Sequence, residues 1–456
     1  MSKGLLIIVI FALLGLIAVV NFPDENNSEE KQNIASKVEQ INSYTERLMY
    51  SQAAAMYREL ISEYPSDYDI SDKYIAFCEE NQFNDELLSE YERRFSLDNS
   101  NKEIAEELLD MYYKNDSEDI YTFMDQYDSL LSDTELFSRI EEESLGKFRY
   151  IGGTLSNVSE WGSSYTLISD ADGRKSISSK SGEIIFPYRE EILSYSSRNG
   201  YIAAKDNGQI VYLDSDGVRR LVPYDNTEKQ LIYLDYAGPF EEGEAFAANV
   251  ELNGVWGYID ESMNMGYLQY EKTTPFSCGI SAAKENGKWC ILNKDFAEIS
   301  TQRYDDIYAD EYGYCCSNNV IYIKGSSSWQ MYGVAFNEEG TTAVSVTKQS
   351  ELCFDDVRPF GDYGAVKVED KWGFIKPDGT WLIEPCYDDA YSFRCGLAPV
   401  MKNGKWGYIS ESGKMVIDAD YDDAISFSEN GVSAVKNDDS WRFIQLNKFY
   451  YLWRQS

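Results

Sequence analysis

The stretch GLAPVMKNGKWGYI at residues 396–409 decides the fold of the larger part of this chain. Two runs with short alternating patterns, 397–402 and 405–410, flank the dipeptide Asn403-Gly404. Asn-Gly favours the two-residue type I′ turn, whose positive φ angles match the twist of paired strands. The stretch therefore predicts an antiparallel β-hairpin, followed by a third strand at 414–418 and a fourth at 423–427.

The same pattern recurs along the chain at a regular interval. In three copies a tryptophan is followed, always at the same separation, by the tyrosine that opens a Tyr-Asp-Asp triplet; the pairs are Trp289 with Tyr304, Trp372 with Tyr387, and Trp406 with Tyr421. The turn position just ahead of the tryptophan gives eight register marks, which are Gly173, Gly208, Gly254, Gly287, Ser327, Asp370, Gly404 and Asp439. The sequence therefore predicts an all-β repeat domain of about eight modules over 150–456.

Three or four strands in a repeat of roughly 40 residues are typical of a β-propeller blade. Eight modules can close into a ring or stack as an open spiral, and the sequence leaves both open. The aromatic segment 449–453 is a candidate for closing the ring by pairing with the first module.

This pattern resembles the WG-repeat family of bacterial tandem modules. The Trp-Gly dipeptide stands in register at Trp256, Trp372 and Trp406, and it is altered after Trp289, Trp329 and Trp441. The resemblance implies a β-repeat architecture and no particular substrate, cofactor or enzymatic activity.

The repeat-defining side chains have two possible roles. They are the six register tryptophans, together with Gly373, Gly407, Tyr304, Tyr387 and Tyr421. Because strand side chains alternate, Trp406 and Tyr408 share one face of the sheet, and Gly407 and Ile409 share the other. The favoured interpretation is packing between modules, with the glycine permitting close approach of an adjacent sheet. The alternative is a set of stacking platforms for sugars or peptides.

The N-terminal residues predict a membrane anchor. Residues 4–20 are an uninterrupted apolar or small run after Lys3, near the short limit for a membrane-spanning helix. No small-x-small cleavage site follows, which favours a retained anchor at 1–22 over a cleaved signal peptide that would release a secreted protein. The charge bias places the N-terminus in the cytoplasm and the bulk of the chain outside the cell membrane.

An acidic linker at 23–35 and a helical region at 36–146 are predicted next. Apolar residues recur there at three- and four-residue spacing, and Tyr57-Arg58 recurs in degenerate form as Tyr91-Glu92. The interval between these two pairs is weakly similar to the helix-turn-helix period of the tetratricopeptide (TPR) repeat. Residues 24–143 contain 32 Asp and Glu against 10 Lys and Arg. We interpret this charge as a solvated outer face.

Composition narrows the possible functions. The chain has 456 residues, a formal net charge of −37 and no histidine. Nucleic acids and anionic lipid surfaces would be repelled, so membrane contact is expected through the N-terminal helix only. The absence of histidine excludes His-dependent nucleophilic catalysis and His-based zinc sites. We expect no metal or cofactor.

Three functions stay open from sequence. The first is a membrane-anchored extracytoplasmic scaffold whose repeats bind a protein partner. The second is a module that binds cell-wall polysaccharide or another carbohydrate through exposed aromatic side chains. The third is a glycoside hydrolase that uses a carboxylate pair, although nothing singles out a pair among 78 acidic residues. A binding function without catalysis is the expectation.

Overall fold

The computed structural model describes residues 26–448, apart from 116, 118, 162–164, 190, 197–198, 215–216, 218–219, 226–229, 241–247, 301 and 326. The chain divides into two compact units, Met1–Ser138 and Arg139–Ser456. The predicted anchor and the aromatic segment 449–453 both lie outside the described residues. Within those residues, every helix is too short or too polar to cross a membrane.

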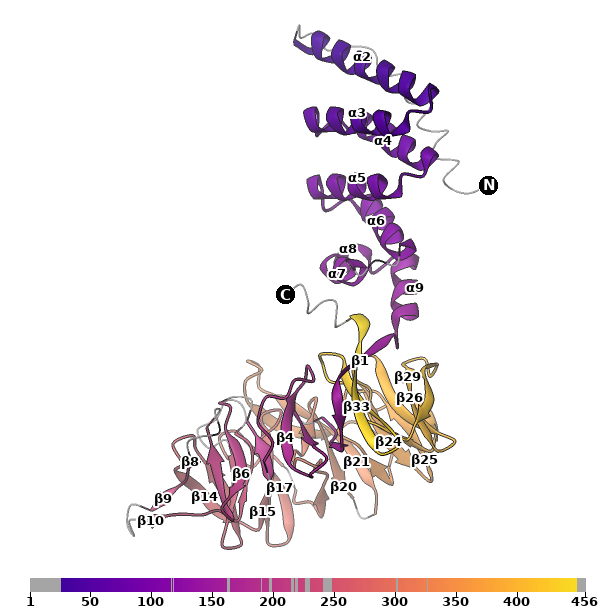
Figure 1. Ribbon diagram of the computed structural model, residues 1–456. Coiled ribbons are helices and arrows are strands. Elements are labelled where there is room, and N and C mark those ends of the chain that lie inside the picture. Colours follow the sequence, from indigo (N-terminus) through magenta and orange to yellow (C-terminus); the bar gives the residue numbers. More distant parts are fainter. Residues whose placement is uncertain are drawn as a thin grey trace. The chain divides into compact units, whose positions relative to one another are not determined.

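The first unit is built from helices that pack against their neighbours in sequence (Figure 1). They are α2 (Asn26–Glu46), α3 (Tyr50–Glu63), α4 (Tyr68–Asn81), α5 (Asn84–Leu97), α6 (Lys102–Lys114), α7 (Asp119–Gln126) and α8 (Asp128–Leu131). The next helix, α9 (Glu135–Ser144), contains the boundary between the two units. Helix α2 begins inside the segment predicted as an acidic linker. The separation between the starts of α3 and α5 equals that between the starts of α4 and α6, and both match the period found in the sequence.

Local sequence signals set the ends of these helices. Asp67 caps α4 by accepting hydrogen bonds from the N–H groups of Asp69 and Ile70, and Asn101 caps α6 through the N–H of Ile104. Ala53, Tyr57 and Leu60 of α3 and Ile70, Tyr74, Phe77 and Cys78 of α4 form part of one core. The apolar stripes detected at helical spacing are therefore the buried faces.

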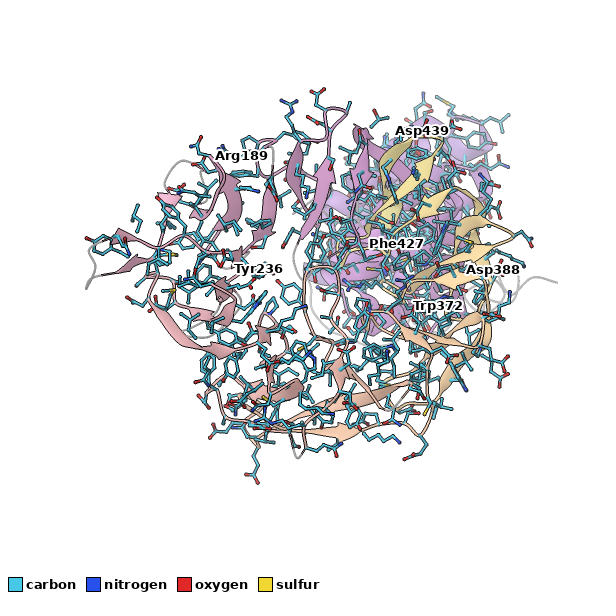
Figure 2. All side chains as sticks on the ribbon, turned by 90° about the horizontal axis from the view of Figure 1, so that it is seen from below. Arg189, Tyr236, Trp372, Asp388, Phe427 and Asp439 are labelled. Atoms are coloured by element: carbon cyan, nitrogen blue, oxygen red, sulfur yellow. The ribbon has the colours of Figure 1, made fainter. Side chains whose placement is uncertain are left out.

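The second unit, where it is described, is built on eight antiparallel sheets that follow one another around a ring (Figure 2). The first is β2 (Asn157–Val158), β3 (Tyr165–Ser169) and β4 (Lys175–Ser179), and the second is β5 (Ile192–Tyr195), β6 (Ile202–Asp206), β7 (Gln209–Leu213) and β8 (Arg220–Leu221). The third is β11 (Tyr236–Ala237), β12 (Ala248–Leu252), β13 (Val255–Ile259) and β14 (Met265–Tyr270), and the fourth is β15 (Lys272–Thr273), β16 (Ile280–Glu285) and β17 (Lys288–Asn293).

The remaining four sheets complete the ring. The fifth is β18 (Asp306–Ile307), β19 (Cys316–Ser317), β20 (Val320–Lys324), β21 (Trp329–Phe336) and β22 (Ala343–Lys348). The sixth is β23 (Asp356–Val357), β24 (Gly364–Val368), β25 (Lys371–Ile375) and β26 (Trp381–Tyr387), and the seventh is β27 (Asp389–Ala390), β28 (Leu397–Lys402), β29 (Lys405–Ser410) and β30 (Met415–Tyr421). The eighth contains β31 (Asp423–Ala424), β32 (Val432–Asn437), β33 (Ser440–Leu446) and β1 (Phe148–Leu155).

All eight register marks lie in the turn between two paired strands of their sheet. In the seventh sheet, Lys402 pairs with Lys405 across Asn403 and Gly404, whose φ angles are 54° and 77°. Positive φ at both positions is the type I′ signature that the Asn-Gly dipeptide predicts. The predicted hairpin of residues 397–402 and 405–410 is confirmed.

The ring closes through its first strand. Strand β1 pairs antiparallel with β33 from Phe148 opposite Leu446 to Leu155 opposite Trp441, so the N-terminal strand completes the eighth sheet (Figure 1). Eight buried clusters then fill the spaces between consecutive sheets. One cluster joins the eighth sheet to the first, and in it the rings of Trp161 and Phe443 stack at 6.3 Å. Closure therefore runs through β1.

Inserted segments lie in two of the longer intervals between register marks. An extra hairpin of β9 (Tyr224–Asp225) and β10 (Gln230–Leu231) falls in the long interval from Gly208 to Gly254. The segment 308–314 falls in the interval from Gly287 to Ser327, which is also longer than most. Repeat length thus varies through loops and extra hairpins, while the sheets keep their strand order.

Candidate functional site

The six repeat tryptophans lie inside the protein or partly inside it. Trp289, Trp372, Trp406 and Trp441 are 3–6% exposed, and Trp256 and Trp329 are partly buried. The four buried tryptophans cannot present an open indole face to a sugar. The arrangement gives no support to the carbohydrate-stacking interpretation.

Each buried tryptophan contacts the sheet that follows its own. Trp406 and Tyr408 of the seventh sheet share a cluster with Ala424, Phe427 and Ile444 of the eighth, while Ile409 faces the sixth sheet. This is the alternation expected for a strand. Trp372, Trp441 and Trp289 occupy the corresponding interfaces of their own sheets. The tryptophans are placed to hold neighbouring sheets together.

The position after the tryptophan requires glycine because backbone atoms of a neighbouring strand lie too close for a Cβ. A Cβ on Gly407 would lie 2.6 Å from the carbonyl oxygen of Ile417, and one on Gly373 would lie 2.6 Å from the nitrogen of Pro385. Both contacts are to the next strand of the same sheet, where the register shifts at a bulge. The close approach is therefore within one sheet, and the adjacent-sheet explanation from sequence differs from the structure.

The Tyr-Asp-Asp triplets connect one sheet to the next. Each tyrosine pairs with the tryptophan of its own copy, as Tyr421 does with Trp406. The following aspartate, Asp422, lies 2.6 Å from Lys405 Nζ of the preceding sheet and accepts the Asp438 N–H of the next hairpin turn at 2.8 Å. Lys371 with Asp388, and Lys288 with Asp305, repeat the ion pair. These aspartates therefore stabilise the connection between consecutive sheets.

The middle of the ring is crossed by the segment 308–314 of the fifth sheet. Tyr312 donates its hydroxyl hydrogen to the Glu160 carbonyl at 2.8 Å, and its ring lies 5.2 Å from that of Tyr165. Both contacts are with the first sheet, on the opposite side of an eight-membered ring. Asp310 holds the crossing segment by accepting the N–H groups of Tyr312 and Tyr314, and burial raises the pKa of Asp310 to about 6.

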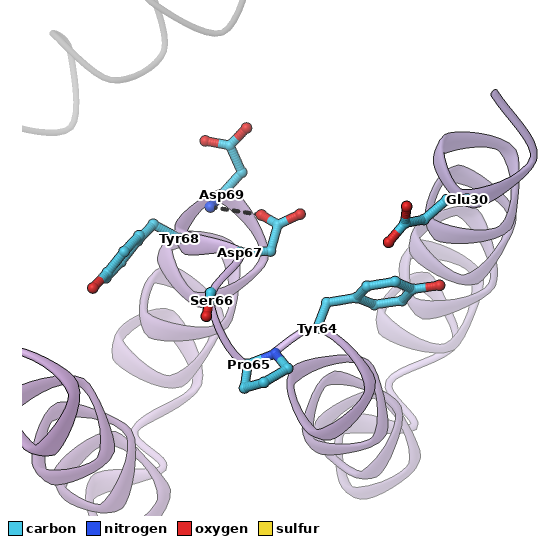
Figure 3. Close-up of a pocket in the computed structure, with 7 residues that line it drawn as sticks. All are labelled: Glu30, Tyr64, Pro65, Ser66, Asp67, Tyr68 and Asp69. Atoms are coloured by element: carbon cyan, nitrogen blue, oxygen red, sulfur yellow. Dashed lines mark hydrogen bonds between the residues drawn. The ribbon is translucent and has the colours of Figure 1, made fainter. Parts of the chain in front are cut away.

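Two hollows open on the helical unit. The first has a volume of about 540 Å³, and Figure 3 shows it between Glu30 of α2 and the turn that joins α3 to α4. Its other lining residues are Tyr64, Pro65, Ser66, Asp67, Tyr68 and Asp69. Asp67 is already engaged as the helix cap. The charged lining residues are all acidic, so the hollow suits a basic or neutral group.

The second hollow, here called the α3–α5 pocket, lies among α3, α4 and α5 and measures about 740 Å³. It is lined by Arg58, Ile61, Ser62, Pro65, Tyr74, Asp85, Glu86, Ser89, Glu90 and Arg93. Tyr74 is 2% exposed, and its hydroxyl makes no hydrogen bond of ordinary geometry among the described residues. A buried hydroxyl in this state is costly for the free protein.

The charged groups of the α3–α5 pocket differ in how firmly they are held. Arg93 makes two hydrogen bonds to Glu90, at 2.8 and 2.7 Å, and a third to the Pro65 carbonyl at 2.7 Å. Arg58 contacts Glu86 at the longer distance of 3.3 Å, and its side chain is 54% exposed. Arg58 is therefore the cation best able to exchange its partner for a ligand.

Burial raises the pKa of Tyr74, which therefore stays protonated at neutral pH and can both donate and accept a hydrogen bond. The pocket thus combines a neutral hydroxyl, an exposed guanidinium and the apolar side chain of Ile61. Pockets that bind ligands commonly combine a few polar groups with apolar lining in this way. Neither the repeat pattern nor a motif marks these residues, so the sequence did not reveal them.

The fold defines a class: an eight-bladed propeller-like repeat protein preceded by a helical unit. Within that class, the model of the WG containing repeat matches residues 256–289, 372–406 and 406–441. The β unit therefore carries WG repeats, as the sequence predicted. Each matched segment runs from one register tryptophan to the next, so the sequence repeat is offset from the sheets.

Solved structures give similarities of low degree. BamB from Moraxella catarrhalis is 12% identical with a TM-score of 0.41, over 65% of this chain and 97% of that one. The Cps50 (Swd1) β-propeller domain of Myceliophteria thermophila is 9% identical with a TM-score of 0.31, over 65% and 99%. With TM-scores below 0.5, these similarities have no bearing on function. No curated protein matches the chain.

Proposed function

We propose that this protein is a non-enzymatic scaffold, anchored in the cell membrane and exposed outside the cytoplasm, which binds a segment of a protein partner in the α3–α5 pocket. The observation that carries the proposal is the buried Tyr74 hydroxyl without a hydrogen bond of ordinary geometry, next to the exposed Arg58. A partner's backbone carbonyl or carboxylate would satisfy both groups at once.

The contacts within the two units support assigning partner binding to the helical unit. In the β unit, the repeated tryptophans and aspartates are engaged in joining sheets, so they are not available for a ligand. The helical unit, in contrast, presents a pocket that contains the buried Tyr74 hydroxyl and the exposed Arg58. We infer that the helices select the partner and that the ring provides a rigid platform.

Site-specific photo-cross-linking tests the pocket. A benzophenone amino acid replaces Ser89, an exposed pocket residue, and the matched control places it at Ser51, an exposed residue of α3 outside the pocket. Irradiation of living cells is expected to give a discrete adduct with one protein at position 89 and none at 51. Adding Arg58→Gln should weaken the adduct. Equal labelling at both positions, or labelling insensitive to Arg58→Gln, would refute the proposed site.

The anchor has a separate test. The apolar run at residues 4–20 supports retention in the membrane. Full-length protein should sediment with membranes and be digested by protease added outside intact cells, whereas a chain that starts at Asp24 should be soluble and protected. Release of a shortened form into the medium would instead indicate cleavage. Failure of this test would leave the pocket proposal standing.

A further inference from the structure

Cys278 occupies a tight turn at the start of the fourth sheet's β16. Ser277 and Ile280 exchange two backbone hydrogen bonds, at 2.9 and 3.0 Å, around Cys278 and Gly279, and Cys278 has a φ of 50°. Its side chain is partly exposed. The Asn319 N–H donates a hydrogen bond to the Cys278 sulfur at 3.4 Å. A backbone N–H directed at sulfur stabilises a thiolate.

Cys316 is buried in the cluster between the fourth and fifth sheets, and the partly buried Cys278 packs against the same cluster. Cys316 belongs to β19 of the fifth sheet, and its carbonyl accepts the Ser277 hydroxyl hydrogen at 2.8 Å, which ties the two backbones together. The neighbouring Cys315 has a different partner, because its sulfur accepts the Thr274 hydroxyl hydrogen at 3.4 Å. Of these two adjacent cysteines, Cys316 is thus the one whose backbone is tied to the turn that carries Cys278.

The seventh sheet supplies a natural comparison. Cys395 occupies the same kind of turn, followed by Gly396, with a φ of 55° and a similar partial exposure. Its thiol donates a hydrogen bond to the Ser428 carbonyl at 3.1 Å. A carbonyl acceptor favours the protonated thiol, whereas the N–H donor at Cys278 favours the thiolate. Two cysteines at equivalent turns therefore have different hydrogen-bond partners.

We propose that Cys278 and Cys316 are a redox pair that forms an intrachain disulfide by exchange with a small-molecule disulfide. The Cys278 thiolate attacks one sulfur of the small disulfide, forming a mixed disulfide and expelling one small thiolate. Cys316 then loses its proton and attacks the Cys278 sulfur, which expels the second small thiolate. The two cysteines are oxidised by two electrons, and the small disulfide is reduced to two thiols that carry the two protons.

The titration behaviour of the two turns agrees with these roles. The neighbouring Cys316 thiol and the Asn319 N–H lower the pKa of Cys278 to about 7, so a large share is thiolate at neutral pH. Burial raises the pKa of Cys395 to about 11. Burial also raises the pKa of Cys316, which keeps it protonated until the mixed disulfide forms beside it. Cys278 is the attacking group and Cys316 the resolving one.

Peptide mapping tests the pair. Full-length protein is treated with oxidised glutathione, blocked with an alkylating agent, digested without reduction and analysed by mass spectrometry. We expect a peptide that contains Cys278 linked to the peptide that contains Cys315 and Cys316, with fragmentation placing the bond on Cys316. The link should persist in Cys315→Ser and disappear in Cys278→Ser and Cys316→Ala. Persistence of the link in Cys316→Ala would overturn the assignment of the resolving cysteine.

Alkylation of the reduced protein tests the activated thiol without any oxidation step. Cys278 should react with iodoacetamide at neutral pH at least roughly tenfold faster than Cys395, its matched control. The wild-type protein alone suffices for this comparison, so a variant that fails to fold does not weaken it. Equal alkylation rates, or glutathione adducts at Cys278 that never resolve into the internal link, would refute the proposal.

Discussion

The replacement Trp406→Ala gives the sharpest test of how the β unit is held together. Trp406 is 4% exposed, its ring lies 5.5 Å from that of Tyr391, and it contacts the eighth sheet. A buried aromatic side chain covers about 150–250 Å², which at about 25 cal/mol per Å² corresponds to roughly 4–6 kcal/mol. Because neighbours relax in part, we expect a loss of about 3–5 kcal/mol in the free energy of unfolding.

The assay is thermal and urea unfolding followed by circular dichroism, with no ligand added. A loss of this size should lower the Tm by on the order of 10 °C. Trp256→Ala is the matched control, because Trp256 holds the same register position but is only partly buried, so its loss should be smaller. A Trp406→Ala protein that melts within about 2 °C of wild type would refute the packing role and return the tryptophans to ligand stacking.

Four further outcomes follow from the contacts described above. Asp422→Ala should lower the Tm more than Lys405→Ala does, because Asp422 also accepts the Asp438 N–H; equal losses would contradict this. Lys405 lowers the pKa of Asp422, so the ion pair stabilises the folded protein above about pH 4 and this stabilisation is lost below it. The difference in Tm between wild type and Asp422→Asn should therefore shrink on acidification. Gly407→Ala should cost about 1–3 kcal/mol of unfolding free energy in urea titrations, because a Cβ meets backbone. Tyr74→Phe should leave the Tm unchanged or raised, since the lost hydroxyl makes no hydrogen bond of ordinary geometry. Cross-linking at position 89 should fall in the same variant. A marked loss of stability would show that the hydroxyl is already satisfied.

The repeat architecture was predictable because it rests on local rules. Asn403-Gly404 specifies its own turn, and the alternation around Trp406 specifies which side chains face which neighbour. These rules act within a single module and are repeated in the next. A module whose pattern is degenerate can therefore be assigned from the clearer patterns of the other modules. The period of the helices was readable for the same reason.

Long-range pairings were not predictable. The ring closes by pairing Phe148–Leu155 with Ser440–Leu446, and no local pattern distinguishes β1 from the outer strand of any other sheet. Tyr74 likewise reads as an ordinary core residue of an amphipathic helix. The pocket beside its hydroxyl is also lined by Arg58 and Ser89 from two other helices, which only the folded chain brings together.

Closure by β1 also imposes a delay during synthesis, because β1 cannot pair until β33 has been translated. The first β-strand of the ring emerges from the ribosome long before its partner, since Arg149 and Asn447 are 298 residues apart in sequence. At about 5–20 residues per second, that separation corresponds to roughly 15–60 s of translation. During this interval β1 carries an unpaired backbone edge, which is the kind of surface that recruits other chains. Nascent protein should therefore depend on shielding of this one strand until the last sheet is complete.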